Sequence, residues 1–391
     1  MKGNKRKAAA RAAASVPAAE APWGKPLKIE RVETTVVRLP YDSGAKQKGW
    51  LGRNWGTLDY VLVRIDTDAG ITGWGDAFGY GATLATKAVV DHLLAPQLIG
   101  KDARDIAGLS RQLQRDNHIW GRYGITMFGI SGIDIALWDI AGKAAGLPLC
   151  RLLGGPVRGE IEAYSSLFKY RDADLVAEKT AESLRQGYRY VKLHETTVPE
   201  VKAARGAAPN AALMVDANCP WTPEEAHAMA AQMKPYDLHW LEEPIFPPED
   251  FAALARLRQR SGVKLAAGEN ACTAFEFARM LQAGAVDYAQ PSVTKVGGIS
   301  EFRKIAALCE THDVTLVPHS PYFGPGLLAT LHLLAALPVE TLAERFFCKV
   351  KESLYGRFID PIDGRYRLPD GPGLGMDPDP AVIKSCRDKS A

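Results

Sequence analysis

The chain has 391 residues, of which 47% are hydrophobic and 24% are charged. These proportions are typical of globular proteins, so they exclude collagen-like, coiled-coil and wholly disordered chains. No apolar run reaches the roughly 18 residues that a membrane-spanning helix needs. The net charge is only +3 at pH 7, and six basic residues against one acidic residue lie within the first 26 positions. The rest of the chain is therefore slightly acidic and lacks the basic stripe of a nucleic-acid-binding protein.

Residues 1–26 form an alanine-rich, basic segment. This segment lacks the apolar stretch of about 7–15 residues that a secretory signal contains. We expect a disordered tail here, and a frayed amphipathic helix or an organelle presequence are the alternatives.

The six cysteines lie far apart, and no two of them form a C-x-x-C pair. This spacing argues against a disulfide framework and against a structural zinc site, because both use closely spaced ligands. We therefore expect free thiols and a cytoplasmic location.

The N-terminal part of the chain changes its hydrophobic period once. Residues 28–40 and 58–67 alternate and are rich in β-branched side chains, and 68–76 supplies an Asp/Gly turn, so this part predicts antiparallel strands. Residues 84–148 place apolar side chains at i, i+3, i+4 and i+7, which predicts three helices. We expect an α+β domain over residues 27–150, ended by the Gly/Pro-rich segment 152–160.

Beyond that segment, short apolar strands alternate with helical stretches. A polar residue near each strand end recurs about every 25 residues, the length of one strand plus one helix. This rhythm predicts a (β/α) barrel over residues 151–345, with its reactive groups where the strands end. An open doubly wound sheet is the alternative, but no G-x-G-x-x-G follows an early strand. The predicted strands are 161–168, 190–195, 212–218, 239–244, 264–270, 287–292, 315–320 and 340–345.

Three acidic residues end consecutive barrel strands, namely Asp216, Glu242 and Glu269. In a barrel their carboxylates converge on one point at the open face, where they repel each other unless a cation joins them. Oxygen ligands without cysteine or histidine favour Mg²⁺, which keeps open positions for water or substrate. Solvated acids at strand ends are the ordinary alternative for any single one of them.

Basic side chains flank this acidic triad on both sides. Lys192 and His194 lie on the preceding strand, and His319 lies two strands beyond the triad, in a turn between prolines. We expect them on opposite sides of the metal, an arrangement suited to moving protons on two faces of a substrate.

Five motifs together resemble the enolase superfamily, mandelate racemase subgroup. They are VDAN (215–218), WLEEP (240–244), GEN (268–270), QPSVTKVGG (290–298) and GISGIDIALWDIAGKAAGLPLCRLLGG (129–155). The resemblance implies an α+β N-terminal capping domain, a modified (β/α)7β TIM barrel, and a C-terminal segment, residues 346–391, that returns to the capping domain. It also implies one essential Mg²⁺ held by Asp216, Glu242 and Glu269, and a homo-oligomer.

The resemblance also implies a reaction. In such enzymes the substrate is a carboxylate, often a sugar acid, that chelates the metal, and a base removes the proton α to the carboxylate. The metal and a nearby cation offset the negative charge of the enediolate. Lys192 matches the first lysine of the second-strand K-x-K motif, so it resembles that cation. His194 takes the second position, where the base is usually lysine, and the sequence leaves open which of the two is the base.

A second departure concerns His319. Subgroup members whose seventh-strand histidine is a base pair it with an aspartate that ends the sixth strand, and Ser292 stands at that position here. A hydroxyl can orient an imidazole but does not stabilise its charged form as a carboxylate does. We therefore expect His319 to protonate a leaving hydroxyl. Glu344 matches a position that often contacts the substrate, and we expect Lys295 to be a structural neighbour of the triad.

Selectivity is expected from loops 41–56 and 78–82, whose Trp50, Arg53, Trp55 and Tyr80 could clamp an anionic, polyhydroxylated ligand. The main hypothesis is a Mg²⁺-dependent lyase that dehydrates a sugar acid to a 2-keto-3-deoxy acid. A racemase, epimerase or cycloisomerase is the alternative within the superfamily, although Ser292 weakens a two-base racemase. A non-catalytic metal-containing binding protein is a remote alternative. The expected partner is a small-molecule carboxylate, with no nucleic acid and no membrane.

Overall fold

The computed structural model describes residues 25–45 and 56–390. The predicted tail therefore lies almost entirely outside the described residues. The N-terminal domain contains an antiparallel sheet of strands β1 (Ile29–Asp42), β2 (Thr57–Thr67) and β3 (Thr72–Ala77). A short strand from near the other end of the chain, β12 (Lys349–Val350), pairs with the outer edge of β1. Both faces of β2 are buried, because Leu58, Tyr60 and Leu62 pack in one hydrophobic cluster and Val61, Val63 and Ile65, on the opposite face, pack in another.

Helices cover one face of this sheet. They are α1 (Thr83–Val89), α2 (Ile106–Asp116) and α3 (Ile125–Ala145). The first of the three helices predicted within residues 84–148 is instead an α-helix followed by a π turn (Val90–Leu94) and a 3₁₀ turn (Ala95–Gln97). Pro96 explains the break, because proline cannot donate the backbone hydrogen bond that a continuing helix requires.

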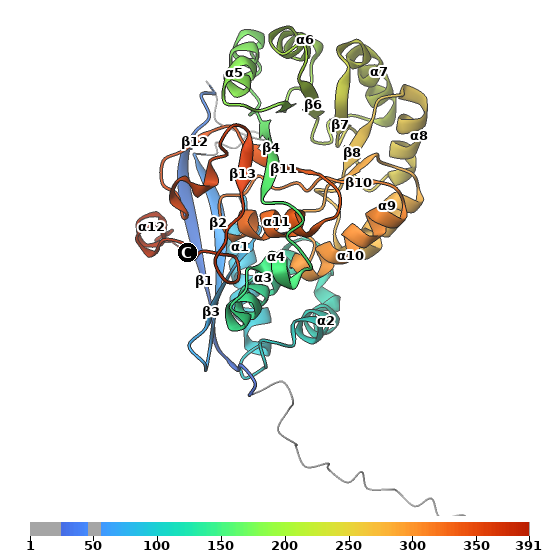
Figure 1. Cartoon of the computed structure of the whole chain (residues 1–391). Helices are drawn as coiled ribbons and strands as arrows, with labels where there is room; N and C mark the ends of the chain where they lie inside the picture. Colours follow the sequence, from blue (N-terminus) through green and yellow to red (C-terminus); the bar gives the residue numbers. More distant parts are fainter. Residues whose placement is uncertain (1–24, 46–55, 391) are drawn as a thin grey trace, which may run out of the picture.

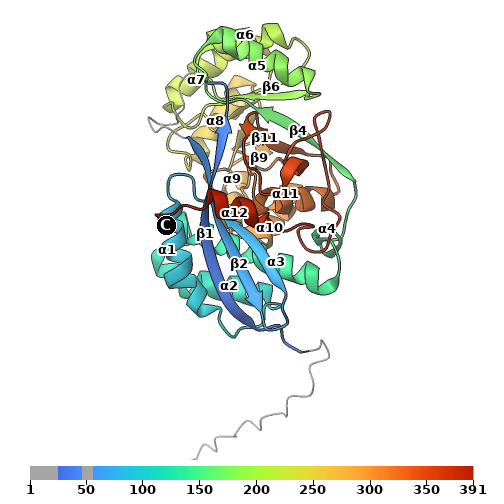
Figure 2. The ribbon, with the colours of Figure 1, turned by 90° about the vertical axis from the view of Figure 1, so that its left-hand side faces the viewer.

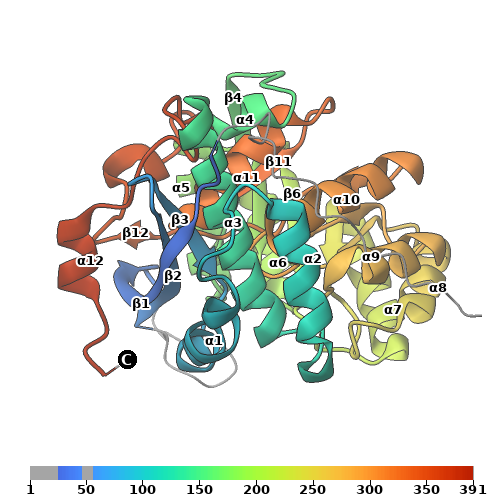
Figure 3. The same ribbon diagram turned by 90° about the horizontal axis from the view of Figure 1, so that it is seen from below.

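Helix α3 lies between the sheet and the barrel (Figure 3). Glycine allows its close approach to β3, because a Cβ added at Gly75 would stand only 1.8 Å from the carbonyl oxygen of Gly132. By length and apolar composition α3 could cross a membrane, but 78% of its most apolar window is buried inside the protein. This burial is what the core helix of a globular domain shows.

Eight parallel strands curl into a barrel surrounded by helices (Figure 1). The strands are β4 (Glu160–Ser166), β5 (Tyr190–Leu193), β6 (Ala212–Asp216), β7 (Leu238–Glu242), β8 (Leu265–Ala267), β9 (Tyr288–Ala289), β10 (Thr315–Leu316) and β11 (Leu342–Phe346). The helices are α4 (Leu149–Leu152), which precedes β4, and then α5 (Ala173–Arg185), α6 (Val198–Ala207), α7 (Pro223–Met233), α8 (Phe251–Ser261), α9 (Thr273–Gln282), α10 (Gly298–Thr311) and α11 (Pro325–Ala336). The predicted barrel and N-terminal α+β domain are thus confirmed.

The second and fifth strands end at Leu193 and Ala267, before the predicted ends at 195 and 270, so His194 stands just beyond β5 and not on it. The sixth and seventh strands are also shorter than predicted. They were expected over 287–292 and 315–320, but β9 ends at Ala289 and β10 ends at Leu316. Pro291 and Pro318 supply the reason, because a proline cannot donate to the strand ladder. Ser292 and His319 consequently stand in loops beyond the strands.

Side chains close the barrel between β10 and β11. The Thr341 hydroxyl donates to the Leu316 carbonyl at 2.5 Å, and the Glu344 amide donates to the Ser320 hydroxyl at 3.1 Å. On its other side β11 pairs in parallel with β4.

The C-terminal segment returns to the N-terminal domain. It contributes β13 (Arg365–Arg367), which pairs with β4, and α12 (Pro380–Cys386), which lies against β1 (Figure 2). An ion pair of 2.7 Å between Arg38 and Asp388 ties the end of this segment to β1.

Candidate active site

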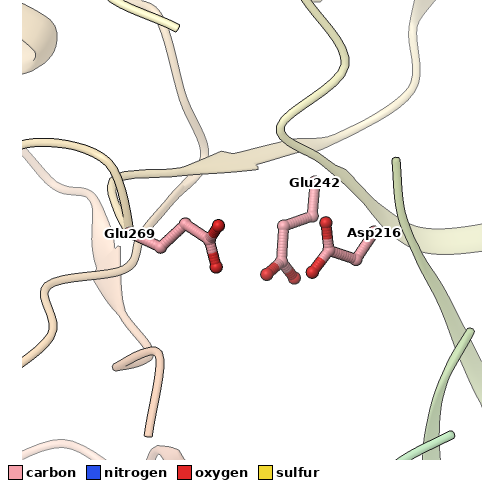
Figure 4. A group of neighbouring side chains, drawn as sticks. All are labelled: Asp216, Glu242 and Glu269. Atoms are coloured by element: carbon pink, nitrogen blue, oxygen red, sulfur yellow. The ribbon is translucent and has the colours of Figure 1, made fainter. Parts of the chain in front are cut away.

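The three predicted metal ligands converge at the open end of the barrel. Asp216 and Glu242 are register partners at the ends of β6 and β7, and Glu269 follows β8 by two residues. One oxygen of each carboxylate lies within 4.8 Å of the others. Figure 4 shows Asp216 and Glu242 pointing to one place, with Glu269 facing them from the other side.

The charges in this cluster are not balanced by the protein alone. Burial and the neighbouring Asp216 carboxylate raise the pKa of Glu242 well above its usual range, although Lys192 opposes this. In Glu269, burial also disfavours the charged form, but His319 and Lys295 outweigh it and lower the pKa to about 2. Oxygen donors that carry surplus negative charge in a buried site fit a hard divalent cation such as Mg²⁺.

Lys192 is the internal counter-ion of the cluster. Its ammonium is fully buried and lies 2.9 Å from Glu242, 2.9 Å from Glu344 and 3.3 Å from Asp216. Burial works against its charge, but these carboxylates outweigh burial and raise the pKa of Lys192 well above its usual range. These contacts therefore favour the charged form of Lys192.

His194 approaches the triad from the β5 side. Its Nε2 lies 3.3 Å from Asp216 Oδ2, and its Nδ1 lies 2.5 Å from the carbonyl oxygen of Leu167. A carbonyl only accepts hydrogen bonds, so Nδ1 carries a proton and Nε2 is the ring nitrogen that faces the triad. The ring is only 6% exposed.

His319 approaches the triad from the opposite side. Its Nε2 lies 2.9 Å from Glu269 Oε2, and its Nδ1 lies 2.6 Å from the Ser292 hydroxyl oxygen. The Ser292 hydroxyl also lies 3.3 Å from the carbonyl oxygen of His319. The serine thus orients the imidazole, and no carboxylate supports the Nδ1 side of the ring in the part of the chain that the structure describes.

Glu344 is an internal residue beside Lys192. It is 1% exposed, and its Oε2 accepts the backbone amide of Ser320 at 3.0 Å. Burial opposes its charge, but Lys192 and His319 outweigh burial and lower the pKa of Glu344 to about 2. It therefore supplies a fixed negative charge beside Lys192.

Two residues near the triad escaped the sequence analysis. Trp240 donates from its indole nitrogen to Glu242 at 2.9 Å, and Glu243 accepts the amide of Gly268 at 2.9 Å. Trp240 was detectable, because it stands two residues before Glu242 and therefore on the same face of β7. Glu243 was not, since its positive φ of 43° turns it out of the strand period.

The remaining predicted site residues are only partly described. The Tyr80 hydroxyl donates to the carbonyl of Pro321 at 3.1 Å, which anchors the ring at the domain boundary. The Lys295 ammonium stands 4.9 Å from the centre of the Phe78 ring and helps to lower the pKa of Glu269, as a neighbour of the triad would. Trp50, Arg53 and Trp55 lie outside the described residues.

A parallel barrel whose strand ends bring together three carboxylates, a buried lysine and two opposed histidines defines a class of metal-assisted acid–base enzymes. Residues 53–154 match the model for the mandelate racemase/muconate lactonizing enzyme N-terminal domain, and residues 175–382 match the enolase C-terminal domain-like model. The chain therefore belongs to the mandelate racemase/muconate lactonizing enzyme family of the enolase superfamily, and it is an enzyme.

Relatives with stated activities cover most of the chain. D-galactarolactone cycloisomerase of Agrobacterium fabrum is 33% identical over 81% of this chain and 88% of its own length. D-galactonate dehydratase of Ralstonia nicotianae is 33% identical over 83% of this chain and 90% of its own. The crystal structure of a Streptomyces coelicolor racemase with bound magnesium is 31% identical, with a TM-score of 0.78, over 92% of this chain and 100% of its own. Both dehydratases and cycloisomerases thus occur among its relatives.

Proposed function

We propose that the enzyme dehydrates an acid sugar to a 2-keto-3-deoxy acid in a Mg²⁺-dependent reaction. The observation that carries this proposal is the pair of histidines, His194 at Asp216 and His319 at Glu269, on opposite sides of one carboxylate triad. Loss of water requires a proton to leave the α carbon and another to join the leaving hydroxyl, so two separate proton-transfer groups are needed. The D-galactonate dehydratase among the relatives supports the same reaction.

Asp216, Glu242 and Glu269 would hold the metal. When bound there, Mg²⁺ would polarise the substrate carboxylate and offset the negative charge that grows as the α proton leaves. The buried Lys192 ammonium adds a second positive charge beside that carboxylate, and Glu344 and Trp240 hold Lys192 and Glu242 in place.

His194 is the better candidate for the base. Lys192 has three carboxylates around its ammonium, which favour its charged form, whereas the Nδ1 of His194 donates to Leu167, so its Nε2 is the ring nitrogen that can accept a proton. His319 serves as the acid, because Ser292 orients its ring without adding the carboxylate that makes a histidine a strong base.

A cycloisomerase is the second candidate, and the A. fabrum relative favours it. The same α-proton abstraction would then be followed by attack or departure of an oxygen within the substrate, with no loss of water. We place the enzyme in the cytoplasm and expect a homo-oligomer.

The test is a panel of acid sugars and their lactones with Mg²⁺, beginning with D-galactonate and D-galactarolactone, in deuterated water. Two quantities are measured, the formation of 2-keto acid and the uptake of deuterium at the α carbon of the remaining substrate. Product lighter than the substrate by one water supports dehydration, and an isomer of unchanged mass supports the cycloisomerase. Absence of both product and deuterium uptake across the panel would contradict the proposed class of substrate.

A further inference from the structure

The segment that follows His319 is bound by the N-terminal domain. We define this segment, residues 320–326, as the His319 loop, which leads into α11. The Tyr80 hydroxyl donates to the carbonyl of Pro321 at 3.1 Å, and the Phe323 amide donates to the Tyr60 hydroxyl at 3.1 Å. The Gly326 amide donates to Asp76 Oδ2 at 3.3 Å. Three backbone groups of one barrel loop are thus held by three side chains of another domain.

Asp76 is buried between the N-terminal domain and the His319 loop. Its side chain is 2% exposed, so no ligand reaches it, and burial raises its pKa to about 8 despite the hydrogen bond from Gly326. A Cβ added at Gly324 or Gly326 would lie 2.9 or 3.0 Å from Asp76 Oδ2. The two glycines therefore leave room for this carboxyl group against the loop backbone.

The far side of the His319 loop is also fixed. The centre of the Phe323 ring lies 4.5 Å from the guanidinium carbon of Arg345. The guanidinium group in turn donates to the Ile359 carbonyl at 3.1 Å and to Asp360 at 2.9 Å. Within the loop, the Tyr322 ring packs edge-on against the His319 imidazole, with ring centres 6.2 Å apart. A displacement of the loop would therefore move the imidazole.

On the other side of the triad, the Nδ1 of His194 donates to the Leu167 carbonyl, in the segment that directly follows β4 of the barrel. The bonds that hold the His319 loop are therefore separate from this one.

We propose that Tyr60, Asp76 and Tyr80 are positioning residues that set the place of the His319 imidazole beside Glu269. The N-terminal domain then controls the position of one of the two proton-transfer groups. The placement of His319 stands on contacts alone, and its consequence for the reaction rests on the proposed function.

The first experiment needs no substrate. In histidine-labelled full-length protein with Mg²⁺, the ring resonances of His319 are identified by their loss in His319→Asn. We expect Tyr60→Phe and Asp76→Ala to shift or broaden them, and Asp76→Asn, which still offers an oxygen to Gly326, to restore them. The matched control is Tyr170→Phe, which removes a 3.2 Å bond from a tyrosine hydroxyl to the Ser43 carbonyl across the same two domains.

Unchanged His319 resonances in Tyr60→Phe would overturn the proposal, and so would an equal shift in Tyr170→Phe. If Asp76→Ala does not fold, Tyr60→Phe decides, because it removes a single oxygen atom. The readout is independent of turnover, so a failure of the proposed function does not affect it.

The second experiment measures the consequence for the reaction. In Tyr60→Phe we expect kcat for 2-keto acid formation to fall about 10- to 100-fold, since misplacement of a catalytic group by about 1 Å has this effect. Uptake of deuterium at the α carbon should stay within about twofold. Equal loss of both rates would show a general structural role and contradict the proposal. If His319→Asn itself leaves product formation intact, the acid role of His319 is wrong, and with it this consequence.

Discussion

The two sides of the carboxylate triad position their proton-transfer groups through different kinds of contact. On the β5 side, Lys192 lies on β5 and His194 directly follows its last residue, and Lys192 is surrounded by carboxylates. On the β10 side, His319 stands in a loop, is oriented by the neutral Ser292, and depends on a loop held by the N-terminal domain. The first side is built around a buried ammonium among carboxylates. The second is built around a histidine that contacts Glu269 and Ser292 and precedes a loop held by hydrogen bonds between domains.

This difference predicts on which side of the triad substitutions are tolerated. A buried charge cluster resists any single substitution, because each removal leaves an uncompensated charge. A set of neutral hydrogen bonds loses about 1 kcal/mol for each bond removed, so it can be adjusted in small steps. We expect the β10 side to be the place where members of such a family vary their chemistry.

Loss of the metal should have the largest effect, because it affects both sides. Treatment with a chelator should abolish turnover, and added Mg²⁺ should restore it. Glu242→Gln should lower activity by more than about 1000-fold, since a Lewis acid supplies several kcal/mol to the reaction. Metal affinity is measured by calorimetry, with Glu276→Gln, a half-buried glutamate on α9, as the control. Full activity of metal-free protein would contradict the metal assignment.

Substitution of His194 and of His319 should have different effects on the two proton-transfer steps. Removing a general acid or base lowers a rate by about 10²- to 10⁴-fold. We expect His194→Asn to lower both α-deuterium uptake and product formation by such a factor, whereas His319→Asn should lower product formation and leave uptake measurable. Rates of both processes are followed by NMR and by a 2-keto acid assay. The reverse pattern would mean that the base and the acid are exchanged.

Lys192→Met should show the difference between the two sides of the triad in the free energy of unfolding. Removal of one partner from a buried charge cluster costs about 3–5 kcal/mol, and we expect this decrease in the free energy of unfolding without Mg²⁺. Lys169→Met is the control, because Lys169 is only half-buried and donates to the Thr196 hydroxyl at 3.3 Å. Chemical denaturation measures both variants, and equal stability of the two would refute the role of Lys192 as counter-ion.

Ser292→Ala should have the smallest effect. It removes one hydrogen bond to the His319 ring, worth about 1 kcal/mol or roughly a fivefold decrease in product formation. Thr180→Val is the control, since the Thr180 hydroxyl is buried on α5 and has no hydrogen-bond partner among residues 25–45 and 56–390. A loss of 100-fold or more in Ser292→Ala would show that the β10 side is as rigid as the β5 side.

Sequence alone was sufficient for the parts of the protein that follow a local period. The strand and helix rhythm predicted the barrel, and the acidic strand ends predicted the cluster of Asp216, Glu242 and Glu269. The period of two also places Lys192 and His194 on one face of the chain, next to that cluster. These features depend on residues that are close in sequence or on a repeat, so they can be predicted from the sequence pattern.

Only the tertiary structure decided how the β10 side is built. Its strands end earlier than the pattern suggested, and side chains rather than a ladder close the barrel between β10 and β11. The contacts of the His319 loop join it to Tyr60, Asp76 and Tyr80, which lie about 240 to 260 residues earlier in the chain. These contacts are made to backbone amides and a carbonyl, groups that nearly all residue types carry. No periodicity or motif in the loop therefore predicts them. Packing of one domain on the other therefore determines the place of His319.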